Sequence, residues 1–302
     1  MLFVPEWDAE IEIDEDLARR LIDGRFPSLD LRSLRRIGEG WDNTVWATGE
    51  DIAFRFPRRA IAIPGVKREM AILPVLAAHL PAPVPDVEYP GAATGEFPWP
   101  WFGSRLIKGT EIALAGLAPA ERRGLAGDLG RFLGRLHDLR PSIAASLDVD
   151  PIGRADMPSR IPRTRAVLDQ VAFLWDGGDL ADRILIAAEG LPADTDPVLV
   201  HGDLNLRHAL VSKTGRLAGV IDWGDMCRAP RCVDLPLYWS LFDGQSRRAF
   251  LDAYGPMTQA TLARARVLAL FFDATLALYA DDKGMDELRR EALHGLDRTV
   301  TA

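Results

Sequence analysis

Short apolar runs separated by turn residues predict a sheet in the first third of the chain. Glycine and acidic residues bound these runs, and the connections between them are short enough for hairpins. A proline-rich extended segment at 81–85 precedes the last run, which is rich in aromatic residues. The predicted strands cover residues 34–37, 45–48, 52–56 and 98–107.

Helical spacing of apolar residues predicts helices through most of the remaining chain. A first helix follows Ile13, with acidic residues early and basic residues later, and ends at Phe26-Pro27. A helix at 66–73 lies among the strands, and we expect Pro74 to bend or interrupt it. Further helical stretches are predicted at 120–137, within 158–190, and at 246–254, 259–280 and 285–298.

The segment 198–225, VLVHGDLNLRHALVSKTGRLAGVIDWGD, concentrates polar residues between buried strands. The pattern predicts a strand, a polar loop and then a hairpin whose second strand ends at Asp222. The loop carries His201, Asp203 and His208. A rigid hairpin therefore delivers two carboxylates and a histidine to one neighbourhood, the setting in which catalytic groups are often found.

This arrangement resembles the catalytic and metal loops of the aminoglycoside and macrolide phosphotransferase family, which are kinase-like enzymes that act on small molecules. The resemblance implies that Asp203 is the catalytic aspartate and Asp222 the main magnesium ligand. The family usually carries Asn five residues after the catalytic Asp, whereas this chain has His208, as the macrolide branch does. Because imidazole is a poorer magnesium ligand than a carboxylate, His208 either assists the metal, acts through a water or orients Asp203.

The implied chemistry needs these residue types. A carboxylate at Asp203 can orient a hydroxyl that attacks a γ-phosphoryl group and take its proton. Magnesium prefers carboxylate oxygens and waters, which suits Asp222. Asp225 either faces the substrate or the metal edge, or stabilises a turn. By resemblance, Asp234 braces the catalytic loop through hydrogen bonds to its backbone.

The glycines between the first two predicted strands point to nucleotide binding. Gly38 and Gly40, followed by Asn43 and Thr44, let backbone amides approach phosphate closely, although such a hairpin is also found with a purely structural role. The resemblance places a phosphate-gripping cation at Arg55. It also places that cation's carboxylate partner at Glu69, which in isolation would be read as an exposed helix charge.

The resemblance extends over about residues 35–295 and implies an α+β, two-lobed, protein-kinase-like fold. An N-terminal nucleotide-binding lobe at 1–107 would hold a five-stranded antiparallel sheet plus a helix. A mostly helical C-terminal lobe at 108–302 would carry the catalytic and substrate-binding residues.

The implied reaction is Mg²⁺-dependent transfer of the γ-phosphoryl group of ATP or GTP to a hydroxyl of a small molecule. We expect that molecule to be an antibiotic, an aminoglycoside or a macrolide. The alternatives are a kinase for a hydroxylated metabolite and a nucleotide-binding module without transfer activity.

Composition narrows the class of protein further. A net charge of −8 argues against a nucleic-acid partner and is compatible with a cationic substrate. There is no basic-then-apolar leader and no apolar run of membrane-spanning length, so we expect a cytoplasmic protein without a membrane partner. Cys227 and Cys232 are expected to be reduced structural residues rather than a metal or redox pair.

Overall fold

The computed structural model describes residues 9–40, 42–139, 143 and 147–302. The chain divides into two compact units. Unit 1 comprises the residues up to 79 together with 83–107, and unit 2 comprises 80–82 together with 108–302.

Unit 1 is built on a five-stranded antiparallel sheet with the order β1-β2-β3-β5-β4. Two hairpins join the first three strands, and Gly38 and Gly40 lie at the first of them. This sheet confirms the predicted kinase-like N-terminal architecture. The strands are β1 (Arg35–Glu39), β2 (Asn43–Thr48), β3 (Ile52–Pro57), β4 (Tyr89–Gly91) and β5 (Trp101–Arg105).

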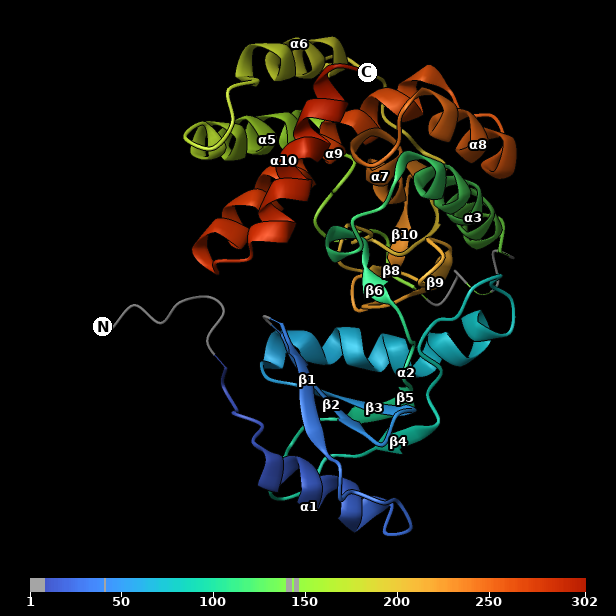
Figure 1. Ribbon diagram of the computed structural model, residues 1–302, viewed down its shortest axis with the longest axis vertical. Coiled ribbons are helices and arrows are strands. Elements are labelled where there is room, and N and C mark those ends of the chain that lie inside the picture. The colour runs from blue at the N-terminus through green and yellow to red at the C-terminus, as the bar shows by residue number, and fades with distance from the viewer. Residues whose placement is uncertain (1–8, 41, 140–142, 144–146) are drawn as a thin grey trace. The chain divides into compact units, whose positions relative to one another are not determined.

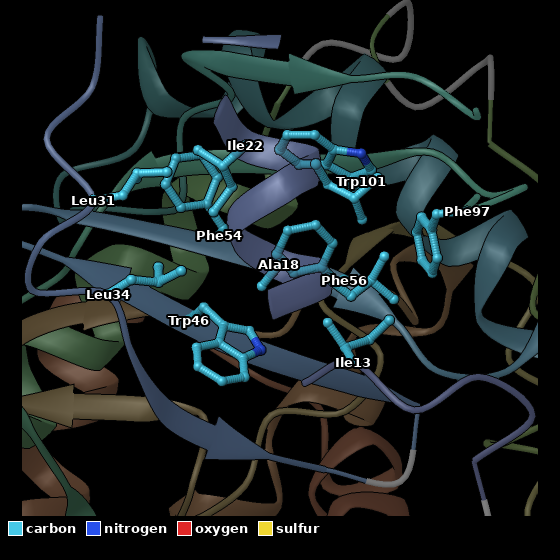
Figure 2. Close-up of a cluster of buried hydrophobic side chains, with 12 residues drawn as sticks. Ile13, Ala18, Ile22, Leu31, Leu34, Trp46, Phe54, Phe56, Phe97 and Trp101 are labelled. Atoms are coloured by element: carbon cyan, nitrogen blue, oxygen red, sulfur yellow. The ribbon is translucent and has the colours of Figure 1, made fainter. Parts of the chain in front are cut away.

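The sheet lies between two helices, α1 (Glu15–Arg25) and α2 (Ile63–Ala77) (Figure 1). Successive side chains of a strand point to opposite faces, so β3 sends Phe54 and Phe56 to one face and Arg55 to the other. Both phenylalanines are fully buried with α1 in a hydrophobic cluster (Figure 2). That cluster comprises Ile13, Leu17, Ala18, Leu21, Ile22, Leu31, Leu34, Trp46, Phe54, Phe56, Phe97 and Trp101.

The two helices begin and end as local sequence dictates, with one exception. Asp14 is the N-cap of α1, its carboxylate accepting from the Leu17 amide at 2.8 Å, and Phe26 is the C-cap. Pro74 was expected to bend or interrupt the second helix, and interruption is wrong, because α2 continues through it to Ala77. Leu73 and Leu76, on either side of the proline, are fully buried, and their packing outweighs the lost backbone hydrogen bond.

Unit 2 is largely helical, as predicted for the C-terminal part. Helix α9 is its centre and packs against α5, α6, α7 and α10, while α3 pairs with α8 (Figure 1). Its helices are α3 (Pro119–His137), α5 (Met157–Val171), α6 (Gly178–Ala188), α7 (Pro236–Ser240), α8 (Gly244–Tyr254), α9 (Gln259–Asp282) and α10 (Asp286–Val300).

Two small sheets in unit 2 carry the polar loop. Strands β7 and β10 pair antiparallel, and β6, β8 and β9 form a second antiparallel sheet. The loop 201–208 connects one sheet to the other. The strands are β6 (Thr110–Glu111), β7 (Val198–Val200), β8 (Ala209–Val211), β9 (Leu217–Val220) and β10 (Cys227–Ala229).

Two further sequence expectations concern the state of the cysteines and the presence of membrane-spanning helices. Both cysteines are free, and burial raises the pKa of each thiol to about 12, which keeps them protonated and unreactive. None of the described helices has the length and apolar character needed to cross a membrane.

Candidate active site

The loop that follows β7 is held in place by a buried carboxylate. Asp234, which is fully buried, accepts hydrogen bonds from the backbone amides of His201 at 2.7 Å and Gly202 at 2.9 Å. The Nε2 of His137 lies 3.1 Å from the same carboxylate, and its Nδ1 lies 2.7 Å from the Tyr254 hydroxyl. Asp234 therefore braces the loop as predicted, and His137 is a buried positioning residue.

Substituting Asp234 tests this brace through pH. Burial pushes its pKa up, but the hydrogen bonds and the nearby histidines outweigh burial and lower the pKa below the usual value. The ionised form thus stabilises the fold above the unfolded-state pKa of about 3.9, and this contribution is lost as pH falls through the folded-state pKa. We expect Asp234→Asn to lower the free energy of unfolding by about 3 kcal/mol at pH 7.

Denaturant unfolding at several pH values checks this expectation. The difference between wild type and Asp234→Asn should be constant from pH 8 to about pH 5 and shrink below about pH 4. The exposed Asp138→Asn is the matched control. A difference that does not change with pH down to the acid transition would contradict the assignment.

His201 connects the loop to the end of β9. Its ring is fully buried, its Nδ1 accepts from the Asp203 amide at 3.2 Å, and its Nε2 lies 3.0 Å from the Ile221 carbonyl. Because Nδ1 accepts, Nε2 carries the proton and donates to that carbonyl. Burial lowers the pKa of His201, so this neutral tautomer persists. One ring therefore holds the backbone of Asp203 at a set position relative to Asp222.

Two backbone positions beside the His201 contacts, Gly202 and Asp222, have a positive φ. Asp222 has φ of +64°, and among the described residues it is the single non-glycine residue with a positive φ. Such strain is typical of functional positions. Gly202 has φ of +90°, and a Cβ there would lie 2.3 Å from the Asp225 carbonyl oxygen, so only glycine fits.

His208 lies between the two aspartates singled out by sequence. Its Nδ1 is 2.7 Å from the main-chain carbonyl of Asp203 and 3.4 Å from that residue's carboxylate, and its Nε2 is 3.5 Å from the Asp222 carboxylate. When the ring is neutral, Nδ1–H donates to the carbonyl and the Nε2 lone pair faces a carboxylate oxygen. The His208 Nε2 lone pair and the Asp222 carboxylate oxygen repel each other. A small divalent metal ion bound by both atoms would remove that repulsion, so this pair of ligands fits such an ion. Among the described residues, no group of three or more His, Cys, Asp or Glu side chains is arranged to hold a metal ion.

The Asp203 side chain is 33% exposed, and the rest of it is buried beside four charged groups. Burial raises the pKa of its carboxyl to about 6, with Asp225 and Asp222 adding to the rise and His208 and Arg154 opposing it. Carboxylates brought this close are typical of sites whose charge is balanced by a metal or a substrate.

Arg154 balances part of this charge and was not identified from sequence. It is 8% exposed and forms ion pairs with Asp150, at 2.6 Å, and with Asp225. Asp225 is therefore tied to a buried arginine while half of its side chain stays exposed. No periodicity or motif marks Arg154. The side chain of Asn205 donates to the Asp203 carbonyl at 3.2 Å, and its Oδ1 accepts from the Arg207 amide at 2.9 Å, which is the Asx turn that an Asn in a loop favours.

In unit 1 the predicted nucleotide-binding residues lie in strands β1 to β3, in the first hairpin and in α2. Arg55 and Glu69 form an ion pair at 3.3 Å, with Glu69 fully buried. The Gly40 amide donates to the Asn43 carbonyl at 2.9 Å and closes the first hairpin. Gly38 lies in β1, with Val45 as its partner on β2, and Thr44, 1% exposed, lies within β2.

Comparison with known proteins gives the same fold. The GDP and kanamycin complex of APH(2")-IIia is 22% identical, with a TM-score of 0.70 over 93% of this chain and 97% of that chain. Macrolide 2'-phosphotransferase MphH from Brachybacterium faecium is 23% identical, with a TM-score of 0.61 over 94% and 98%. At these identities the likeness establishes the fold alone.

Sequence comparison is more specific. An uncharacterised Bacillus subtilis (strain 168) protein, YcbJ, is 34% identical over 56 residues, which span 18% of this chain and 18% of that protein. The model of the Phosphotransferase enzyme family matches residues 33–268, which include both the β1–β2 hairpin and the loop with its aspartates. The chain belongs to the Phosphotransferase enzyme family.

Proposed function

We propose that the protein transfers the γ-phosphoryl group of ATP or GTP to a hydroxyl of a small molecule in a Mg²⁺-dependent reaction. The observation that carries the proposal is the placement of His208 between the carboxylates of Asp203 and Asp222, with Asp222 held in the left-handed region. Relatives in solved structures bind GDP, ADP or ATP.

The residues of unit 2 take distinct roles in this proposal. Asp203 accepts the hydrogen bond of the attacking hydroxyl and takes its proton. Asp222 and His208 hold the metal ion, which when bound supplies positive charge near the phosphoryl oxygens. Asp225, positioned by Arg154, faces the acceptor.

Unit 1 supplies the nucleotide-binding residues. Arg55, oriented by Glu69, binds phosphate oxygens, and the hairpin residues Gly38, Gly40, Asn43 and Thr44 cover the phosphates with backbone groups. Residues 1–107 then act as the nucleotide-binding lobe and 108–302 as the catalytic and acceptor-binding lobe.

Variants of the Arg55–Glu69 pair are expected to change the free energy of unfolding and the nucleotide affinity differently. Arg55→Ala removes the guanidinium beside a buried carboxylate and is expected to cost about 3 kcal/mol of unfolding free energy. Adding Glu69→Gln should restore most of that stability through a coupling of about 1–3 kcal/mol. Nucleotide affinity should stay reduced by about 10-fold or more in both variants, since a charge-assisted bond to phosphate is lost.

Unfolding curves and nucleotide titrations of the two single variants and the double variant measure both quantities. Recovery of nucleotide affinity together with stability in the double variant would mean that Arg55 serves the fold and not the phosphates.

The acceptor class is proposed from the relatives and from charge. Solved structures of the same fold include complexes with kanamycin, gentamicin and streptomycin, and a macrolide 2'-phosphotransferase. The net charge of −8 also suits a cationic acceptor. Aminoglycosides and macrolides are therefore the first acceptors to test. A hydroxylated metabolite is the second candidate, favoured by a buried arginine of α5 described below.

A phosphoryl-transfer assay tests the function. Purified protein, Mg²⁺ and ATP or GTP are combined with aminoglycosides, macrolides and hydroxylated metabolites, and phosphorylated product is detected by mass. Product that is absent with Asp203→Asn and after metal removal supports the proposal. Tight nucleotide binding without either hydrolysis or transfer would instead indicate a nucleotide-binding module.

A further inference from the structure

A buried arginine in unit 2 is not used by the reaction described above. Arg160, the fourth residue of α5, is 4% exposed. Its guanidinium carbon lies 4.4 Å from the centre of the Phe271 ring on α9, and its Nε donates to the Arg154 carbonyl at 3.0 Å. Helices α5 and α9 pack along each other at this position (Figure 1).

This guanidinium has no carboxylate partner in the described parts of the chain. Its charged neighbours Arg163 and Arg154 repel it, and the nearby carboxylate of Asp150 is already bonded to Arg154. Burial, followed by these two arginines, lowers the pKa of Arg160. Its terminal nitrogens make no hydrogen bond to a described residue, yet neither is sealed from solvent. Two donor groups therefore face accessible space from an otherwise buried side chain.

The fold gains little from such a cation. Burying an unpaired charge is costly, and stacking on one aromatic ring offsets only part of that cost. A leucine or methionine at this position would pack against Phe271 without that cost. The charge is therefore better explained by a ligand than by stability.

Arg160 is linked to the candidate site through Arg154. The Arg154 carbonyl accepts its Nε–H, and the Arg154 side chain is bonded to Asp225, whose charge acts on Asp203. Arg160 and Asp225 are therefore connected through one residue, Arg154, within unit 2.

We propose that Arg160 binds a carboxylate of the acceptor, so that the acceptor is a hydroxylated carboxylic acid. The two free terminal nitrogens match the two oxygens of a carboxylate, and the single negative charge balances the single unpaired cation. The identity of this group as part of an acceptor rests on the proposed function, whereas binding of the carboxylate does not. A polycationic aminoglycoside would meet repulsion at the same position.

Carboxylate binding is tested on the whole protein with acetate as the probe. Protein labelled with ¹⁵N-arginine gives an Nε–H signal for Arg160, because this proton is buried and hydrogen bonded. Arg160→Gln identifies the signal by its disappearance. Arg183→Gln, which removes an exposed arginine of α6, is the matched control and should leave the signal unchanged.

We expect acetate to shift the Arg160 signal saturably, with sodium chloride at equal ionic strength producing no such shift. Inorganic phosphate is titrated in parallel. A signal that does not respond to acetate would reduce Arg160 to a structural cation and overturn the proposal. A phosphate response that saturates at lower concentration than the acetate response would overturn the carboxylate assignment.

The acceptor role is measured separately with matched pairs that differ at the acid group, namely gluconate and gluconamide, glycerate and glyceramide, and pantothenate and panthenol. For an acid that is phosphorylated, Arg160→Gln should lower kcat/KM roughly 10- to 100-fold through KM, as expected for a lost charged hydrogen bond. The neutral partner should be unaffected, and Arg160→Lys should recover part of the loss. Equal losses on acid and neutral partner would contradict the role.

Measuring hydrolysis of ATP or GTP without acceptor distinguishes failure of the phosphotransferase function from failure of carboxylate binding at Arg160. Hydrolysis that is lost in Asp203→Asn but retained in Arg160→Gln supports the phosphotransferase function whatever the acetate result. A saturable acetate shift without any hydrolysis or transfer would leave the carboxylate site in place and reject the reaction.

Discussion

Replacing Asp203 with asparagine is expected to lower the rate of phosphoryl transfer between about 10²- and 10⁴-fold, the usual contribution of a positioned general base. The amide keeps the shape of the side chain but cannot take the hydroxyl proton. Nucleotide affinity should stay within about threefold of wild type, since a general base contributes to the transition state more than to the ground state. Stability should be unchanged or higher, because burial already disfavours the charge of this carboxyl and raises its pKa to about 6.

Steady-state kinetics, nucleotide titration and thermal unfolding together check this result. Asp196→Asn, the same substitution at an exposed position just before β7, is the control. A variant at Asp203 that turns over at the wild-type rate would remove this residue from the mechanism. A variant that loses activity only through unfolding would show an equal loss of nucleotide binding.

Replacing Asp222 with asparagine is expected to abolish the dependence of nucleotide binding on Mg²⁺ and to lower turnover by about 10² or more, because hard cations prefer a charged oxygen ligand. The fold should tolerate the change. Asparagine adopts the left-handed region more readily than most residues, and one of the carboxylates that raise the pKa of Asp203 is removed.

Asp222→Ala separates the two properties of this position. It also lacks the ligand, but a Cβ residue without a polar side chain is strained at this φ, so it should be less stable than the asparagine variant by about 1 kcal/mol. Calorimetric titration of a non-hydrolysable nucleotide with and without Mg²⁺ provides the measurement. Magnesium-dependent tightening that persists in both variants would place the metal elsewhere.

Regular patterns in the sequence were enough to predict the frame of the molecule. The short apolar run 52–56 predicted a strand, and the structure shows β3 there, with Arg55 paired with Glu69 as the family resemblance implied. The spacing of Asp203, His208 and Asp222 around a hairpin likewise predicted their convergence. These signals are local, since each depends on strand periodicity or on a short loop.

The features that were not predicted depend on contacts between residues far apart in the sequence. Arg154 meets Asp225 across 71 positions of sequence, and Arg160 meets Phe271 across a helix interface. No local preference encodes either contact. Pro74 was expected to bend or interrupt its helix because propensity alone disfavours it, and α2 is not interrupted because the burial of its neighbours overrode that propensity.

The strand order of unit 1 bears on how the protein folds as it leaves the ribosome. Strand β5 is the fifth along the chain but lies between β3 and β4 in the sheet. Trp101 and Phe97 belong to the hydrophobic cluster that packs against α1. A nascent chain ending near residue 79 has α1, three strands and α2, but it has an open β3 edge and lacks both of these rings. Unit 1 therefore completes its core only after β5 has emerged, and until then the exposed β3 edge is the part of the nascent chain most in need of protection from aggregation.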